Sequence, residues 1–153
     1  MTTAYDSVYD LFLIEIKDWK IDALYTASPT NFAIYLKGFL VLCIPEFDVF
    51  SDQSLARTDS TSLFTETLTD KNMQILAKMM VIKWMKKEIQ DVRQMNLHIT
   101  GKDFRTYSEA QNLKGKESYL IFMKEELSQA LSNYAWYGYD FTDWQAGTFE
   151  TGA

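Results

Sequence analysis

The chain has 153 residues, the length of a single domain, and 47% of them are hydrophobic, which is enough to form a globular core. Its formal net charge is −6, opposite in sign to a surface that grips the phosphates of nucleic acid. The charge therefore indicates either plain solubility or a protein that lies near nucleic acid without binding it. Aromatic residues make up 15% of the chain, and so many rings need a surface on which to be buried.

The first predicted element is a helix that begins near Thr3 or Ala4 and ends near Trp19. Apolar residues recur in this stretch with the period of a helix, at Tyr5, Val8, Tyr9, Phe12 and Ile16. Additional leucine and isoleucine residues widen the apolar face, so this helix is expected to be buried on most sides.

The second predicted helix covers residues 29–43. Ser28 followed by Pro29 is typical of a helix start, because a proline at the first helical position loses no hydrogen bond. Pro45 is expected to end the helix, since the residue before a proline avoids the helical conformation. Lys37 is almost its only charged residue, which predicts a central position in the fold.

Residues 46–68 lack a helical period. The stretch "DQSLARTDSTS" is small and polar, so it is predicted to be a loop. In "SLFTETLT" apolar and polar residues alternate, which suits a short strand at about residues 62–68. Such a strand needs a partner, so either a neighbouring subunit pairs with it or the segment is merely extended.

Two long helices are predicted in the second half of the chain. Thr69 and Asp70 supply an N-cap and an acidic first turn, and the apolar pattern that follows predicts a helix over residues 70–96. A last helix is expected over residues 108–137, where Gly138 would end it.

These elements predict an all-α protein. We expect a four-helix bundle-like domain with a long polar loop, a possible short strand or hairpin, and a non-helical aromatic C-terminal tail. The helical domain would cover residues 1–138, and residues 139–153 would form a docking tail.

The sequence holds no catalytic, cofactor-binding or metal-binding motif. The single cysteine, Cys43, and the single histidine, His98, lie far apart, whereas metal sites cluster their ligands. Cys43 falls in an apolar run and is expected to be a buried, inert thiol. No apolar run reaches the roughly eighteen residues of a membrane span. We therefore expect no enzyme, no metal, no cofactor and no membrane contact.

Basic residues gather in two parts of the sequence. Lys83, Lys86 and Lys87 share one face of the helix at 70–96, and four more follow, namely Lys102, Arg105, Lys114 and Lys116. A solvated surface is the simpler interpretation of these charges. The alternative is a docking patch for an acidic partner surface.

The stretch "NYAWYGYDFTDWQAGTFE" near the C-terminal end holds seven aromatic residues. Chain termini are usually polar, so these rings are buried either in their own fold or on another protein. Tryptophan and tyrosine are favoured anchors of protein interfaces. The candidate interface residues are Trp136, Tyr137, Tyr139, Phe141, Trp144 and Phe149.

The order of these features resembles that of the small α-helical head–tail connector proteins, or adaptors, of tailed bacteriophages. The resemblance covers most of the chain, but the loop at residues 46–68 is long, and its possible strand is not typical of the plainest bundles, which leaves the neck layer open. The stretches that carry it are "YDLFLIEIKDWKIDAL", "SPTNFAIYLKGFL", "LTDKNMQILAKMMVIKWMKKEIQDV", "SEAQNL" and "DWQAGTF".

The resemblance implies a structural virion protein of the neck, made in the host cytoplasm. Members of this family form a dodecameric ring that docks on the portal protein and on the next neck or tail protein, while DNA passes through without specific binding. The six aromatic residues named above would then contact the portal or a neighbouring subunit. The polar stretch Ser51–Thr67 would face the lumen or a neighbour.

Two other interpretations stay open from the sequence. A non-viral adaptor domain would bind one partner through its aromatic tail and would not form a ring. An enzyme that uses carboxylates and a divalent ion is the third and least supported interpretation.

Overall fold

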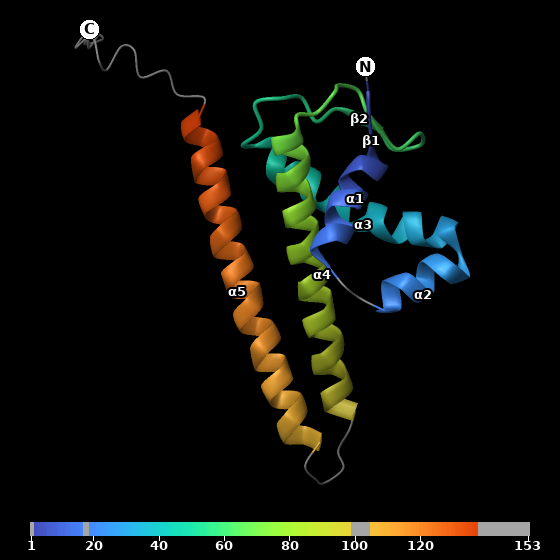
Figure 1. The fold of residues 1–153 in the computed structure, drawn as a ribbon, viewed down its shortest axis with the longest axis vertical. Helices are drawn as coiled ribbons and strands as arrows, with labels where there is room; N and C mark the ends of the chain where they lie inside the picture. Colours follow the sequence, from blue (N-terminus) through green and yellow to red (C-terminus); the bar gives the residue numbers. More distant parts are fainter. Residues whose placement is uncertain (1, 17–18, 99–104, 138–153) are drawn as a thin grey trace, which may run out of the picture.

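The computed structural model of the protein describes residues 2–16, 19–98 and 105–137 (Figure 1). These residues form a mostly helical fold with a small sheet added to it. The helices are α1 Tyr5–Glu15, α2 Trp19–Ala27, α3 Pro29–Asp48, α4 Asp70–His98 and α5 Arg105–Tyr137, and the strands are β1 Thr3–Ala4, β2 Arg57–Thr58 and β3 Leu63–Phe64.

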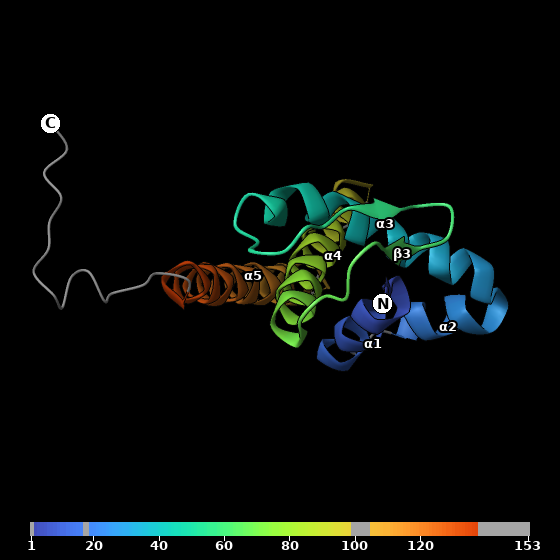
Figure 2. The same ribbon diagram turned by 90° about the horizontal axis from the view of Figure 1, so that it is seen from above.

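Helix α4 is the centre of the fold. Helix α5 runs antiparallel along one side of α4, while α1 and α3 pack on other parts of the α4 surface (Figures 1 and 2). The C-terminal end of α3 also reaches α5, where Phe47 meets Tyr134. The sequence explains this position, because a helix that is apolar nearly all round must be covered nearly all round. In the first half of α4 the buried residues are Ile75, Leu76, Ala77, Met79, Met80, Val81 and Ile82. The prediction that the helix at 29–43 is central is therefore wrong, and α3 keeps an exposed side.

Helix α1 supplies much of the aromatic core. Tyr5 and Phe12 are completely buried, and the Tyr5 ring packs against Phe64 of β3 with ring centroids 5.0 Å apart. The Tyr5 hydroxyl donates a hydrogen bond of 2.6 Å to Asp59. The helix ends at Glu15 because the backbone turns extended at the next residue, so the predicted end near Trp19 is wrong.

Helix α2 is not predicted by the sequence pattern. It packs on α3, where Tyr25 meets Phe32 edge-on with ring centroids 5.1 Å apart. Lys20 forms an ion pair of 3.0 Å with Glu88 of α4. The helix has only nine residues, too few to show a clear apolar period of its own.

Helix α3 begins as predicted, because the Ser28 side chain accepts a hydrogen bond of 3.3 Å from the backbone N–H of Asn31. The predicted end is wrong, since the helix continues through Pro45 to Asp48. A proline inside a helix costs about 3 kcal/mol. Beyond it, however, Phe47 is completely buried, and burying a phenylalanine contributes about 1.5–3 kcal/mol. Tertiary packing therefore holds the last turn in place.

The strand predicted at about residues 62–68 is confirmed in a shorter form. β3 lies between β1 and β2 and is antiparallel to both. Its partners therefore come from the same chain and not from a neighbouring subunit. Phe64 of β3 is completely buried, so the sheet attaches the polar loop to the core.

Helices α4 and α5 form a long antiparallel hairpin, as the two predicted helices imply (Figure 1). The predicted cap is present, because Thr69 Oγ1 accepts a hydrogen bond of 3.3 Å from the N–H of Asn72. Lys78 of α4 and Glu126 of α5 form an ion pair of 3.0 Å between the two helices. Helix α5 begins at Arg105, one turn earlier than predicted.

Candidate protein interfaces

Tyr134 fixes the C-terminal end of α5 to the body of the protein. Its hydroxyl donates a hydrogen bond to the carboxylate of Asp52 and accepts one of 3.0 Å from the backbone N–H of the same residue. The ring packs edge-on against Phe47 with centroids 5.7 Å apart, and Lys71 Nζ lies 4.5 Å from its centroid. The end of α3, the start of α4 and the end of α5 therefore meet at this tyrosine.

The predicted interface residues begin directly after this anchor. Trp136 lies on α5 with 62% of its surface exposed. Tyr137 is the last residue of α5, but its side chain is not among those described. The other four lie outside the described residues, as does the predicted boundary between domain and tail, and their role stays a prediction: Tyr139, Phe141, Trp144 and Phe149.

The outer side of α3 carries a row of exposed residues that the sequence analysis does not identify. The exposed fractions are 63% for Ile34, 60% for Leu42 and 80% for Val49. Successive members of the row are three or four positions apart, which places them on one side of the helix, and none is charged. We call the row the α3 face; it consists of Ile34, Gly38, Leu42, Pro45 and Val49.

Helix α3 is apolar on its inner side as well. Leu36, Leu40 and Phe47 are completely buried in the core. Among the described helices, α3 alone is long and apolar enough to cross a membrane, by length and composition only. One apolar side of this helix is already covered by its own domain, so the exposed side is the part that needs a second surface.

A second exposed apolar group lies halfway along α5. Tyr119 and Phe122 stack with ring centroids 6.4 Å apart, and Ile121 and Phe122 are both more than half exposed. Met123, the next residue, is buried and packs into the core. We call Tyr119, Ile121 and Phe122 the α5 cluster. It lies on a different helix from the α3 face.

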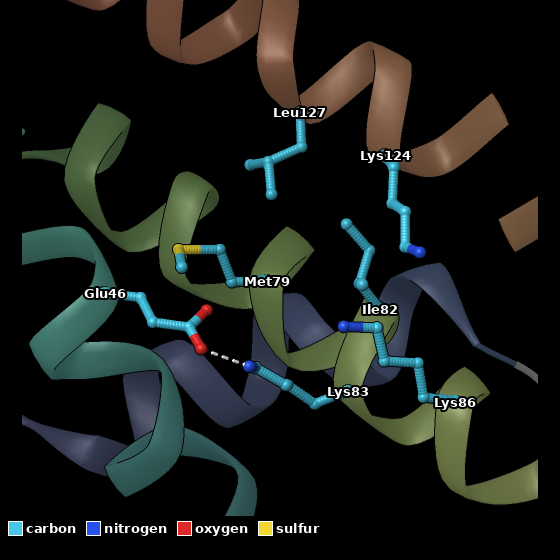
Figure 3. A pocket seen from close by; sticks show the side chains of 7 residues that line it. All are labelled: Glu46, Met79, Ile82, Lys83, Lys86, Lys124 and Leu127. Atoms are coloured by element: carbon cyan, nitrogen blue, oxygen red, sulfur yellow. Dashed lines mark hydrogen bonds and ion pairs between the residues drawn. The ribbon is translucent and has the colours of Figure 1, made fainter. Parts of the chain in front are cut away.

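A pocket of about 240 Å³ lies where α3, α4 and α5 meet (Figure 3). Lys83 and Glu46 form an ion pair across it. Among the described residues no ion pair includes Lys86 or Lys124, so the rim has an excess of positive charge. We call this the lysine pocket; its floor is Met79, Ile82 and Leu127, and its rim is Glu46, Lys83, Lys86 and Lys124.

The predicted basic cluster is thus divided between two roles. Lys83 and Lys86 line the lysine pocket, whereas Lys87 lies over the Tyr35 ring at 4.6 Å and covers α3. Lys114 and Lys116 lie on α5 away from this pocket, and Lys102 and Arg105 are not among the side chains described.

Cys43 is a buried free thiol, as the sequence predicts. Burial raises the pKa of this thiol to about 12, and a protonated thiol is neither a nucleophile nor a metal ligand at neutral pH. Within the described ranges, no group of three or more His, Cys, Asp or Glu residues could hold a metal ion.

The chain matches no protein-family model, no curated protein and no solved structure. The resemblance to phage connector proteins therefore stays a prediction. The function has to be inferred from the exposed surfaces themselves.

The sequence analysis does not identify the α3 face or the α5 cluster, although both have a signal in the sequence. The scarcity of charge in α3 indicates apolar surface on two sides, and the interpretation as a central helix accounts for only one of them. In "SYLIFM", five apolar residues follow one another on α5, more than a single buried face of a helix holds. A run of this kind on a helix with one neighbour leaves some of its side chains uncovered.

Proposed function

We propose that the protein is a structural subunit of a bacteriophage neck ring, which joins the portal to the tail and lets DNA pass. The observation that carries the proposal is the presence of two exposed apolar surfaces, the α3 face and the α5 cluster, on two different helices of one domain. The proposal includes a bundle-like domain and a docking tail at residues 139–153.

A closed ring requires that each subunit carry two different surfaces that complement each other. We propose that the α3 face of one subunit packs on the α5 cluster of the next. Because the two surfaces are different and belong to different helices, contacts of this kind lead from one subunit to the next rather than closing a symmetric dimer. Covering one exposed leucine or phenylalanine contributes about 1.5–3 kcal/mol, so a few such side chains support a stable contact.

The net charge of −6 supports the same proposal. A ring through which DNA moves must not bind its phosphates, and many copies of an acidic subunit repel them. The charge is equally compatible with a protein that never meets DNA. It therefore agrees with the proposal but does not distinguish it from the alternative.

A non-viral adaptor that binds one partner is the second candidate function. The exposed indole of Trp136 at the end of α5 favours it, because tryptophan is a frequent anchor of binary interfaces. The two candidates differ in stoichiometry, since an adaptor stays a monomer or a one-to-one complex.

The first prediction concerns the two apolar surfaces. In the full chain, Leu42→Glu and Phe122→Glu should each weaken ring assembly at least about tenfold, because assembly would bury a carboxylate. The free energy of unfolding should change by no more than about 0.5 kcal/mol, since both side chains are exposed. Mass photometry measures the assembly of the protein alone and together with the portal protein that the proposal expects to be encoded in its gene neighbourhood.

Ile14→Glu is the matched control, because Ile14 is 80% exposed on α1 and belongs to neither surface. It should leave assembly unchanged. The proposal would be contradicted if the ring still forms in both Leu42→Glu and Phe122→Glu, or if Ile14→Glu weakens its assembly as much as they do. So would a gene that has no portal and major capsid genes in its neighbourhood.

A further inference from the structure

The lysine pocket has two chemically different parts. Its floor consists of apolar side chains, and its rim carries three ammonium groups and one carboxylate (Figure 3). Lys83 is paired with Glu46, whereas Lys86 and Lys124 have no ion-pair partner among the described residues. A group that fits this arrangement is apolar and has a carboxylate close to it.

The size of the pocket narrows the choice of ligand. Sites that enclose a small-molecule ligand usually measure roughly 300–1,000 Å³. A volume of about 240 Å³ is smaller, and it suits side chains of a peptide rather than a whole metabolite. The surface is therefore suited to a peptide segment in which rings alternate with acidic residues.

The C-terminal segment of this chain, residues 138–153, has this composition. It contains no Lys or Arg, and its acidic residues lie next to rings: Asp140 stands between Tyr139 and Phe141, and Asp143 precedes Trp144. The acidic side chains of this segment thus complement the lysines of the pocket, and the aromatic rings next to them complement its apolar floor.

The length of the C-terminal segment allows it to reach a neighbouring subunit. Leu127 lies ten residues before the end of α5, which is about 15 Å back along the helix axis. A segment of sixteen residues spans up to about 50 Å, which covers this distance and also permits entry into the pocket of an adjacent subunit. The proposed ring places such a subunit beside every copy, and segments exchanged between neighbours would link the subunits of the ring.

We infer that the lysine pocket receives the C-terminal segment, residues 138–153, of a second copy of this chain. The inference rests on the proposed ring function, because it names one contact by which neighbouring subunits hold each other. The acidic side chains meet Lys86 and Lys124, and one aromatic ring covers the floor formed by Met79, Ile82 and Leu127.

The identity of the occupant is tested by disulfide crosslinking of the full chain. Leu127→Cys is combined with Trp144→Cys or with Phe149→Cys, while the native Cys43 is buried and stays inert. Under mild oxidation we expect crosslinked dimers and a ladder of higher oligomers on a non-reducing gel. A crosslink within single chains, or no crosslink in either double variant, would overturn the inference.

The charge complementarity is tested by reversal. Lys86→Glu combined with Lys124→Glu should raise the protein concentration at which oligomers dissociate by about tenfold or more, since two attractions become repulsions. Adding Asp140→Lys and Asp143→Lys to the same chain should restore assembly. Lys114→Glu with Lys116→Glu, the same charge change on α5 outside the pocket, is the control and should have little effect.

These measurements separate the inference from the proposed function. If assembly is unchanged in Lys86→Glu with Lys124→Glu but is lost in Leu42→Glu, the inference is overturned and the ring proposal is left intact. Interchain crosslinks in a protein that forms only dimers, with or without portal protein, would support the segment contact and contradict the ring.

Discussion

Two buried tyrosines, Tyr5 and Tyr134, attach the polar loop to the helices. Each ring lies in the core, and each hydroxyl donates a hydrogen bond to a carboxylate of the loop region, Asp59 and Asp52 respectively. The hydrogen bond holds the pKa of each carboxyl below its usual value. These two tyrosines thus attach the loop between α3 and α4 to α1 on one side and to α5 on the other.

Gln53 adds a third attachment within the same loop. Its side chain donates a hydrogen bond of 3.2 Å to the carbonyl of Thr67 and accepts bonds of 2.8 Å from the N–H of Thr69 and 2.7 Å from the amide of Asn72. One side chain therefore connects the start of the loop to the start of α4. A loop held in this way presents a defined surface.

At this scale we predict that Tyr134→Phe lowers the free energy of unfolding by about 0.5–1.5 kcal/mol at neutral pH, because one hydrogen-bonding hydroxyl is lost. The Asp52 pKa is lowered in the folded protein, so its contribution is present above the unfolded pKa of about 3.9 and is lost as the pH falls through the folded pKa. The difference between wild type and variant should therefore shrink below about pH 4.

Urea denaturation at several pH values between neutral and acidic measures this difference. Tyr119→Phe, which alters an exposed tyrosine on the same helix, should stay within about 0.5 kcal/mol of wild type. A difference between wild type and Tyr134→Phe that stays constant with pH would contradict the assigned hydrogen bond.

At the scale of elements, α3 shows how packing overrides a local signal. Pro45 removes the N–H that would otherwise bond the carbonyl of Val41, and it lies on the exposed side of the helix. Ile44 and Phe47 on the other side are buried, and they keep the last turn helical. The helix therefore continues because its buried side supplies more free energy than the missing hydrogen bond removes.

We predict that Pro45→Ala raises the free energy of unfolding by about 1–3 kcal/mol, because a helix interior regains its hydrogen bond. Pro29→Ala is the matched control at the first turn of the same helix, where proline fits. It should be neutral or slightly destabilising, by up to about 1 kcal/mol. Thermal and chemical denaturation measure both, and a loss of stability in Pro45→Ala would show that the helix needs the proline.

At the scale of the whole molecule, α5 is covered along one side by α4 and is anchored at its end by Tyr134 (Figure 1). Tyr134 is the last member of the core that the described residues form. This anchor fixes the end of α5, so removing the residues after Gly138 tests whether the folded domain needs them.

We predict that a chain ending after Gly138 unfolds cooperatively, with a free energy of unfolding within about 1 kcal/mol of the full chain. Its assembly and its binding to the portal should be lost or strongly weakened. Calorimetry and mass photometry measure the two effects. Loss of cooperative unfolding would mean that the aromatic residues of the segment belong to the core of their own subunit.

Much of the helical fold follows from the sequence. The caps at Ser28 and Thr69 depend on residues only three positions apart, and the long apolar periods of α4 and α5 identify their helices within about one turn. The strand at Leu63–Phe64 was recognisable from its alternation, because that pattern is local as well. Such signals survive because no distant contact opposes them.

Tertiary structure alone decided the remainder. It settled that α3 passes Pro45, that α4 rather than α3 is central, and that β3 pairs within its own chain, because each outcome depends on which distant side chains meet. The aromatic residues at the C-terminal end are visible in the sequence as candidate anchors. The α3 face shows in the sequence only as a scarcity of charge, and the lysine pocket does not show at all, since exposure and the meeting of Lys86 with Lys124 exist only once α3, α4 and α5 have packed together.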